Sequence, residues 1–296
     1  MRRSRAFSVR RRGGFGEGAV RVRVDDGVEL AVTVHGAGPP LLCVHGFGGA
    51  KEDFADHLER LGTRARVVLV DLRGHGDSGG PADPAAYSLD RCAADLWAVA
   101  DALGLGRVRL LGHSMGGMVV RRMAVTAPDR VDAVVFESTA AGPPRGLEPD
   151  LVDLGAALAL EDFAALKAVL DEARVLGTPA YERLLADRPG FTDYVDGKWA
   201  RLVPAMWSAL APAIAREPDA THEVRAIACP VLVIVGALDA VFLDASTAIA
   251  AAAPDARLVV VADAGHHPHF EDPEAWFVAL ATFLDGLAEP EGADPS

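Results

Sequence analysis

The sequence predicts an α/β fold, with a mostly parallel central sheet, helices on both faces of the sheet and a helical lid insertion. Three observations predict it. Short apolar runs without polar alternation recur along the chain, stretches with helical spacing lie between them, and one long segment contains no such run. Unalternating apolar runs are typical of strands buried on both faces, and strand–helix alternation is typical of parallel sheets.

The first two predicted strands differ from the later ones. Residues 19–24 and 28–34 alternate apolar with polar side chains around Asp-Asp-Gly, which predicts an antiparallel hairpin. Buried parallel strands are predicted at residues 41–46, 66–71, 107–113, 132–138, 231–236 and 257–263. Helices are predicted at residues 88–103, 115–126, 244–252 and 273–287.

Residues 139–224 interrupt this order, because they contain helix-like stretches and turn residues but no buried strand pattern. An insertion at the carboxyl edge of a sheet forms a cap over whatever lies there. We therefore predict a core of residues 19–138 and 225–288 with a helical cap at 139–224. The Arg-rich residues 1–18 and the last residues, 289–296, are predicted to be disordered tails.

Composition narrows the class of function. The 296 residues carry a formal net charge of −13, although the first dozen hold six arginines and no acid. An acidic body repels nucleic acid and anionic membranes, and no stretch is apolar for long enough to span a bilayer. No apolar segment follows the arginines, which argues against an export signal. We expect a cytoplasmic protein with a small-molecule substrate and three free cysteines, of oligomeric state left open.

The strongest chemical signal is Gly112-His113-Ser114-Met115-Gly116-Gly117, placed between a predicted strand and a predicted helix. This is the Gly-x-Ser-x-Gly pattern in the context of a strand–turn–helix elbow, where a strained serine needs glycines for close backbone approach. Ser114 is therefore the predicted nucleophile.

A serine hydroxyl needs a base, and the base needs an orienting carboxylate. His266 follows the last predicted strand after a glycine and is preferred to His267 and His269 as the base. Asp239, just beyond the strand at 231–236, is preferred as the acid. Glu137, at the end of the strand at 132–138, remains the alternative acid.

Backbone groups near Ser114 are predicted to stabilise negative charge. The N–H groups of Phe47, in a glycine-rich turn, and of Met115 are the expected oxyanion hole. His45 and His75 are expected to bond loop backbone instead of taking part in catalysis. An apolar substrate pocket is predicted from His113, Trp199, Trp207 and Met206, although the cap aromatic residues also fit simple helix packing.

Five motifs together resemble the α/β-hydrolase family, over about residues 28–138 and 228–287 with the cap unmatched. They are Val-His-Gly-Phe-Gly-Gly (44–49), Asp-Leu-Arg-Gly-His-Gly-Asp-Ser (71–78), Gly-His-Ser-Met-Gly-Gly (112–117), Gly-Ala-Leu-Asp (236–239) and the stretch at 264–274. The resemblance implies an oxyanion N–H at Phe47 and a base at His266. Serine at 114 excludes the branches of this family whose nucleophile is aspartate.

The resemblance and the predicted triad imply a serine hydrolase that needs no metal or cofactor. The apolar pocket predicted in the cap suits a small, partly hydrophobic ester, lactone or thioester as its substrate. Residues 45–54 and 136–144 are also similar to the menaquinone-pathway synthase that eliminates pyruvate, so a non-hydrolytic lyase or C–C bond hydrolase is the alternative. A lyase for a carboxylated substrate would use cap cations, for which the candidates are Arg145, Arg174, Arg183, Lys198 and Arg201. A third hypothesis is that the protein is a ligand receptor built on a hydrolase fold.

Overall fold

The computed structural model describes residues 9–11, 18–174 and 177–287. Within them, one twisted sheet of nine strands has the order β1-β2-β3-β5-β4-β6-β7-β8-β9. The strands are β1 (Val9–Arg11), β2 (Ala19–Arg23), β3 (Glu29–His35), β4 (Pro40–Val44), β5 (Arg66–Val70), β6 (Val108–His113), β7 (Val131–Glu137), β8 (Val231–Gly236) and β9 (Ala256–Val261). Pairing is antiparallel from β1 to β5 and parallel from β5 to β9. The predicted α/β class with a mostly parallel sheet is confirmed.

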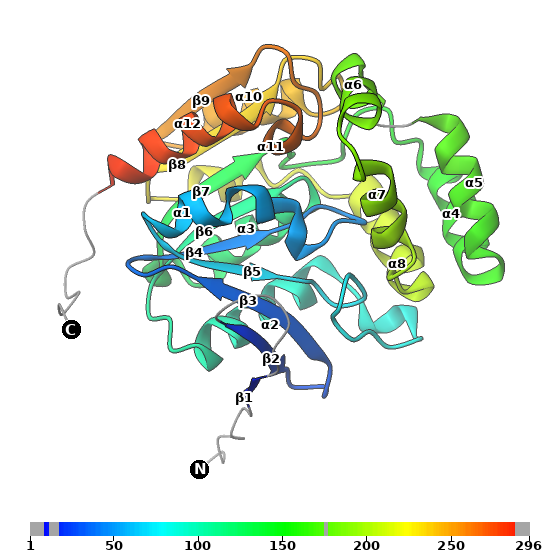
Figure 1. Ribbon diagram of the computed structural model, residues 1–296, viewed down its shortest axis with the longest axis horizontal. Coiled ribbons are helices and arrows are strands. Elements are labelled where there is room, and N and C mark those ends of the chain that lie inside the picture. Colours follow the sequence, from blue (N-terminus) through cyan, green and yellow to red (C-terminus); the bar gives the residue numbers. More distant parts are fainter. Residues whose placement is uncertain (1–8, 12–17, 175–176, 288–296) are drawn as a thin grey trace.

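Helices flank both faces of this sheet (Figure 1). Those of the core are α1 (Leu58–Gly62), α2 (Leu89–Ala102), α3 (Met115–Thr126), α10 (Leu243–Ala252), α11 (Pro268–Glu271) and α12 (Pro273–Asp285). Short 3-10 helices are η1 (Lys51–His57), η2 (Pro84–Ala86) and η3 (Pro128–Arg130). Every strand and helix predicted in the core is present, with ends that differ from the prediction by at most two residues.

Alternate side chains of the strands divide the core into two layers. In β4, Leu42 and Val44 belong to the layer packed under α2, α3 and α10. Leu41 and Cys43, which point to the other face, belong to the layer under α1 and α12. This period of two explains why runs such as 41–44 are apolar at every position, since both faces are covered.

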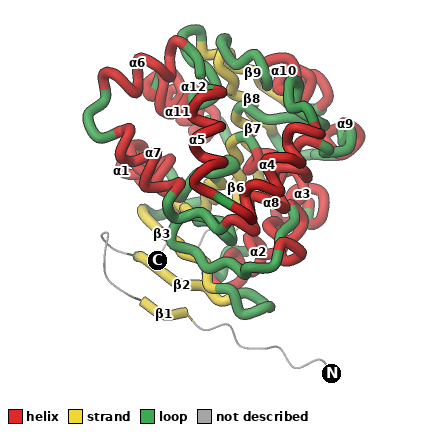
Figure 2. Tube along the Cα trace, turned by 90° about the vertical axis from the view of Figure 1, so that its right-hand side faces the viewer, coloured by secondary structure: helices red, strands yellow, loops and turns green. Residues whose placement is uncertain are grey.

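Strand β9 departs from its prediction as a strand buried on both faces. Leu258 is 38% exposed and Val260 is 46% exposed, although every residue of this strand except Arg257 is apolar. The reason is position, because β9 is the last strand of the sheet and has one neighbouring strand, β8. Figure 2 shows β9 and β1 at opposite ends of the sheet.

The segment 139–224 is helical where the structure describes it, and no strand occurs in 139–174 or 177–224. It contains α4 (Pro149–Glu161), α5 (Phe163–Ala173), α6 (Pro179–Asp187), α7 (Phe191–Trp199) and α8 (Pro204–Ala215), with α9 (Thr221–Arg225) at its end. Helices α4 to α8 lie along one edge of the sheet, on the right in Figure 1. We call residues 139–224 the helical segment; its role as a cap stays a prediction.

The N-terminal segment that was predicted to be disordered contains strand β1, which pairs with β2. The rest of that tail, residues 1–8 and 12–17, and the C-terminal residues 289–296 lie outside the described residues. Among the described residues, no helix combines the length and the apolar character that a bilayer span requires.

Candidate active site

Strand order brings the candidate residues to one place. The chain runs from β4 outward to β5 and then returns to β6 on the other side of β4, so the order of the strands reverses between β4 and β6. Ligands of parallel α/β sheets bind beyond the carboxyl ends of the strands at such a point. The glycine-rich turn at 46–49 follows β4, and Ser114 follows β6.

Ser114 occupies a strained elbow between β6 and α3. Its φ of 53° and ψ of −119° place a non-glycine residue in a region that L side chains rarely adopt. Two glycines permit this turn. A Cβ on Gly112 would lie 2.3 Å from the carbonyl oxygen of Gly116, and a Cβ on Gly116 would lie 2.3 Å from that of Val44. The Ser114 N–H donates to the Glu137 carbonyl oxygen at 2.8 Å, which fixes the elbow against β7.

His266 and Asp239 meet beside this elbow. The Nδ1 atom of His266 lies 2.9 Å from Oδ2 of Asp239, and both side chains are buried. The other carboxylate oxygen accepts the Phe242 N–H at 3.1 Å, and the Phe242 ring stacks on the His266 imidazole at 4.8 Å between centroids. With Nδ1–H donating to the carboxylate, Nε2 is the nitrogen that can accept a proton.

The two rival histidines have other partners. Nδ1 of His269 lies 2.6 Å from Oε1 of Glu137, and both residues are fully buried. Nδ1 of His267 lies 3.7 Å from Glu271. The Glu137 carboxylate, the alternative acid, is therefore directed to His269, whereas Asp239 is directed to His266.

His113 lies in a different place from the one predicted. It was expected to line the substrate pocket, but its ring is buried and packs against His266, His267 and His269. Its Nε2–H donates to the His266 carbonyl oxygen at 2.8 Å. Burial holds the pKa of His113 well below its usual range, so the ring is neutral near pH 7. His113 ties the nucleophile elbow to the loop that carries His266.

The turn at residues 46–49, which we call the oxyanion loop, packs on the same elbow. A Cβ on Gly46 would lie 3.1 Å from the Ser114 Cβ, which places Phe47 next to the nucleophile. Met115, the first residue of α3, is buried directly behind Ser114. The side chains of His45 and His75 form hydrogen bonds with the backbone of this loop. The structure brings the two predicted oxyanion residues to the nucleophile; their function stays a prediction.

His45 and His75 bond loop backbone, as expected. Nε2 of His45 accepts the Leu72 N–H at 3.0 Å, while its Nδ1 donates to the Gly46 carbonyl at 2.8 Å. Nε2 of His75 accepts the Gly48 N–H at 3.3 Å. Accepting at one nitrogen requires a neutral ring, and burial lowers the pKa of both histidines.

The three predicted pocket residues of the helical segment have separate surroundings. The Trp207 ring lies 5.6 Å from that of Phe47, beside the oxyanion loop. Trp199 stacks on Phe163 at 4.5 Å within the segment. Met206 is fully buried, and its Cβ lies 2.6 Å from where a Cβ on Gly74 would be. Only Trp207 of these three contacts the candidate site through a described ring pair.

The candidate cap cations have acidic or carbonyl partners. Arg145 pairs with Asp244, Arg174 with Glu182 and Arg201 with Asp77, while Arg183 donates to the Asp263 carbonyl. Lys198 donates to Asp53 at 2.7 Å and is the least exposed of the four in ion pairs. Sequence reasoning did not link Asp53 to Lys198 or to its other partner, Tyr194, because no motif connects residues so far apart in the chain.

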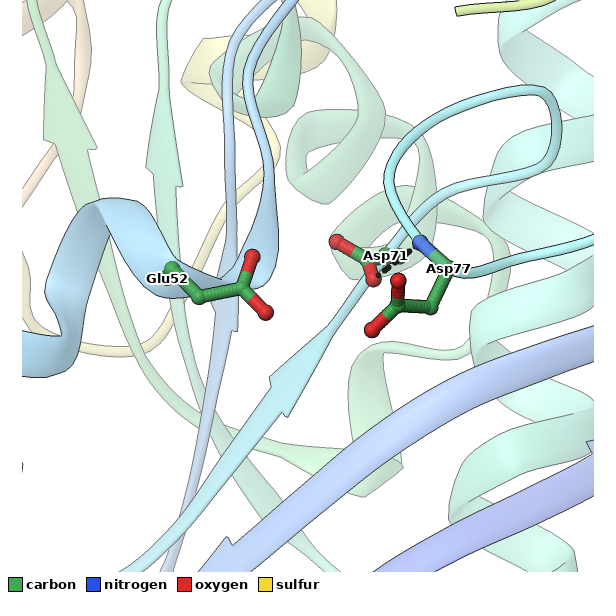
Figure 3. Close-up of side chains that lie close together, drawn as sticks. All are labelled: Glu52, Asp71 and Asp77. Carbon is green, nitrogen blue, oxygen red and sulfur yellow. Dashed lines mark hydrogen bonds between the residues drawn. The ribbon is translucent and has the colours of Figure 1, made fainter. Parts of the chain in front are cut away.

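Figure 3 shows three carboxylates that lie close together, those of Glu52, Asp71 and Asp77. Carboxylate oxygens are the ligands that hard cations prefer. The Lys51 ammonium, however, lies 2.5 Å from Glu52 and 2.8 Å from each of Asp71 and Asp77. This ammonium therefore lies among the three carboxylates and offsets part of their negative charge. The expectation that the protein needs no metal stays a prediction.

Comparison with known proteins agrees with the fold. Residues 39–273 match the family model described as alpha/beta hydrolase fold. The chain belongs to the α/β-hydrolase family. Its curated relatives include a Bacillus subtilis protein named as a candidate 2-succinyl-6-hydroxy-2,4-cyclohexadiene-1-carboxylate synthase, 30% identical over 91% of this chain and 100% of that one.

Two solved structures extend the comparison. A hydrolase from Pseudomonas aeruginosa PA01 is 29% identical, with a TM-score of 0.78 over 91% of this chain and 99% of that one. A thermophilic esterase from Thermogutta terrifontis is 28% identical, with a TM-score of 0.72 over 90% and 98% of the two chains. This α/β hydrolase therefore has hydrolases and esterases among its relatives, as the motifs predicted.

Proposed function

We propose that this protein is a serine hydrolase that cleaves a small, partly hydrophobic ester, lactone or thioester through an acyl-enzyme intermediate. The observation that carries the proposal is the Asp239–His266 pair, 2.9 Å apart, beside a serine at a φ of 53°. A nucleophile elbow, a base and an orienting acid together are what acyl transfer to water requires.

In the proposed mechanism, Nε2 of His266 takes the Ser114 proton as Oγ attacks the substrate carbonyl. Asp239 holds the Nδ1–H tautomer and stabilises the imidazolium that forms. The N–H groups of Phe47 and Met115 donate to the oxyanion, aided by the positive end of α3. His266 then protonates the leaving group, and it later deprotonates the water that releases the acid and regenerates Ser114.

The side chains around the oxyanion loop favour a partly apolar substrate. Trp207 lies against Phe47, and a Cβ on Gly48 would lie 3.8 Å from Leu202. Both contacts come from the helical segment. An acyl group bound next to the loop would therefore meet aromatic and aliphatic surface. The similarity to an esterase supports the same class of substrate.

The test is hydrolysis of p-nitrophenyl acetate, butyrate and octanoate by the wild type, Ser114→Ala and His266→Ala, with labelling by a fluorophosphonate. We expect kcat/KM to fall by on the order of 10⁴-fold or more in both variants, because the triad acts as a unit. His267→Gln, one residue from the base, is the matched control and should retain turnover. Labelling that persists in Ser114→Ala would refute the assignment of the nucleophile.

A lyase is the second candidate, and the 30% identity to the candidate synthase over that protein's full length favours it. Its substrate would carry carboxylates, yet Arg145, Arg174, Lys198 and Arg201 are paired with acids of this chain. Pyruvate release from the synthase substrate, with no acyl adduct on Ser114 by mass spectrometry, would favour the lyase. An acyl adduct with ester turnover would favour the hydrolase.

A further inference from the structure

Asp53 joins the helical segment to the turn behind the oxyanion loop. It lies on η1 and is only 4% exposed. Its Oδ1 accepts from the Tyr194 hydroxyl at 2.6 Å and from the Lys198 ammonium at 2.7 Å, both on α7. Its Oδ2 accepts the Ala50 N–H at 3.1 Å, directly after the loop. One carboxylate thus bonds both parts at once.

The same carboxylate is in close contact with the oxyanion loop itself. A Cβ on Gly49 would lie 2.5 Å from Oδ2 of Asp53, so the close approach of this carboxylate requires glycine at position 49. The Gly49 N–H donates to the Gly46 carbonyl at 3.0 Å, which closes the turn that contains Phe47. A shift of the carboxylate would therefore displace the turn that presents the Phe47 N–H.

The buried negative charge of Asp53 requires its two hydrogen-bond donors on α7, Tyr194 and Lys198. Burial alone would raise the pKa of Asp53, but the charge of Lys198, which also donates a hydrogen bond to the carboxylate, brings that pKa below its usual range. The carboxylate is therefore ionised at any pH near neutral. A buried carboxylate that loses its cation is strongly destabilised, because nothing replaces the lost hydration. If α7 moves away, Asp53 has to move toward water.

We propose that Asp53, Tyr194 and Lys198 are positioning residues that couple the docking of α7 to the shape of the oxyanion loop. The helical segment then contributes to transition-state stabilisation as well as to covering the site. This inference rests on the proposed function, since the loop matters catalytically only if it binds an oxyanion.

A second ion pair joins the same two parts of the chain and serves as a control. Arg188, after α6, lies 2.7 Å from Asp56 on η1, with side chains 39% and 44% exposed. This ion pair also joins the helical segment to η1, but neither of its side chains has a described contact with residues 46–50. Exposed pairs of this kind contribute little to stability, because water screens the charges.

The kinetic experiment compares Lys198→Met, Tyr194→Phe and Arg188→Met with the wild type on p-nitrophenyl butyrate. We expect kcat to fall about 10- to 100-fold in the first two variants, with KM within about threefold, because a displaced loop weakens transition-state binding only. Arg188→Met should keep the wild-type kcat. A rise in KM alone for Lys198→Met would overturn the proposal and indicate that Lys198 binds substrate. Equal effects in all three variants would also overturn it.

Amide hydrogen exchange gives a readout that does not depend on activity. Residues 46–50 should exchange faster in Lys198→Met and Tyr194→Phe than in the wild type, while Arg188→Met should match the wild type. Unchanged exchange in the first two variants would refute the coupling even if kcat fell. Faster exchange in a protein that hydrolyses no ester would leave the coupling standing and refute the proposed function instead.

Discussion

Two buried carboxylates at the ends of neighbouring strands each have a histidine partner. Asp239, after β8, bonds His266, and Glu137, at the end of β7, bonds His269. The two pairs differ in what else they hold. The Glu137 backbone carbonyl accepts the Ser114 N–H, so this residue also stabilises the turn that contains the nucleophile. Asp239 faces the proposed base directly. We infer that Asp239 acts in catalysis and Glu137 in stability.

Substitution of each acid by its amide separates these roles. In Asp239→Asn we expect kcat to fall by on the order of 10⁴-fold, because the amide favours the wrong tautomer of His266. In Glu137→Gln we expect the free energy of unfolding to fall by about 3 kcal/mol or more, because a buried pair loses one charge. Steady-state kinetics and urea unfolding of both variants measure this. A larger loss of kcat in Glu137→Gln than in Asp239→Asn would reverse the assignment.

At the scale of elements, the position of α3 depends on how closely its first turn approaches β4. Glycine at 116 and 117 removes side chains from the face of α3 that meets β4 and Thr139. The Thr139 hydroxyl in turn donates to the Ser114 carbonyl at 2.6 Å. Helix α3 is thereby held with its N-terminus next to Ser114, where its N–H groups can stabilise negative charge.

Gly116→Ala tests this close approach. The added Cβ would lie 2.3 Å from the Val44 carbonyl oxygen, so helix and strand must separate. We expect a loss of about 3 kcal/mol or more in the free energy of unfolding, together with loss of ester turnover. Gly106→Ala is the control, since its Cβ would meet nothing within 4 Å. Equal stability of the two variants in urea would show that α3 can shift without cost.

At the scale of the whole molecule, buried ion pairs between described residues join the helical segment to the core in two places. Asp53 receives Lys198 and Tyr194 on one side of the site. On the other side, Arg121 of α3 pairs with Glu217, and both are 2% exposed. Each carries a charge that is costly to bury alone, so the segment and the core stabilise one another.

The pH dependence of stability follows from the lowered pKa of Asp53. Because the folded-state value lies below the unfolded value of about 3.9, its contribution is fully present above about pH 5 and is lost as pH falls further. The difference in free energy of unfolding between the wild type and Asp53→Asn should therefore be constant from pH 8 to 5 and shrink below about pH 4. Asp56→Asn, in the exposed pair, should differ little at any pH. A difference that grows on acidification would contradict this.

The sequence by itself determined the class of fold and the order of its elements. Runs such as 41–44 and 231–236 are apolar at every position, and only strands covered on both faces bury such runs completely. The glycines around Ser114 predicted the elbow, because a strained turn with close backbone contacts excludes side chains. These are local properties, so they can be read along the chain.

The tertiary structure decided what depends on neighbours in space. Strand β9 was predicted to be buried on both faces, as β8 is, but it lies at the edge of the sheet and is partly exposed. His113 was predicted to line the substrate pocket, but its ring is buried and donates a hydrogen bond to the His266 carbonyl oxygen. The sequence preferred Asp239 to Glu137 as the partner of His266 but left both open, and it did not indicate the contact of Lys198 with Asp53. These two contacts join residues 27 and 145 positions apart. Such contacts are set by strand order and helix docking, which no local pattern encodes.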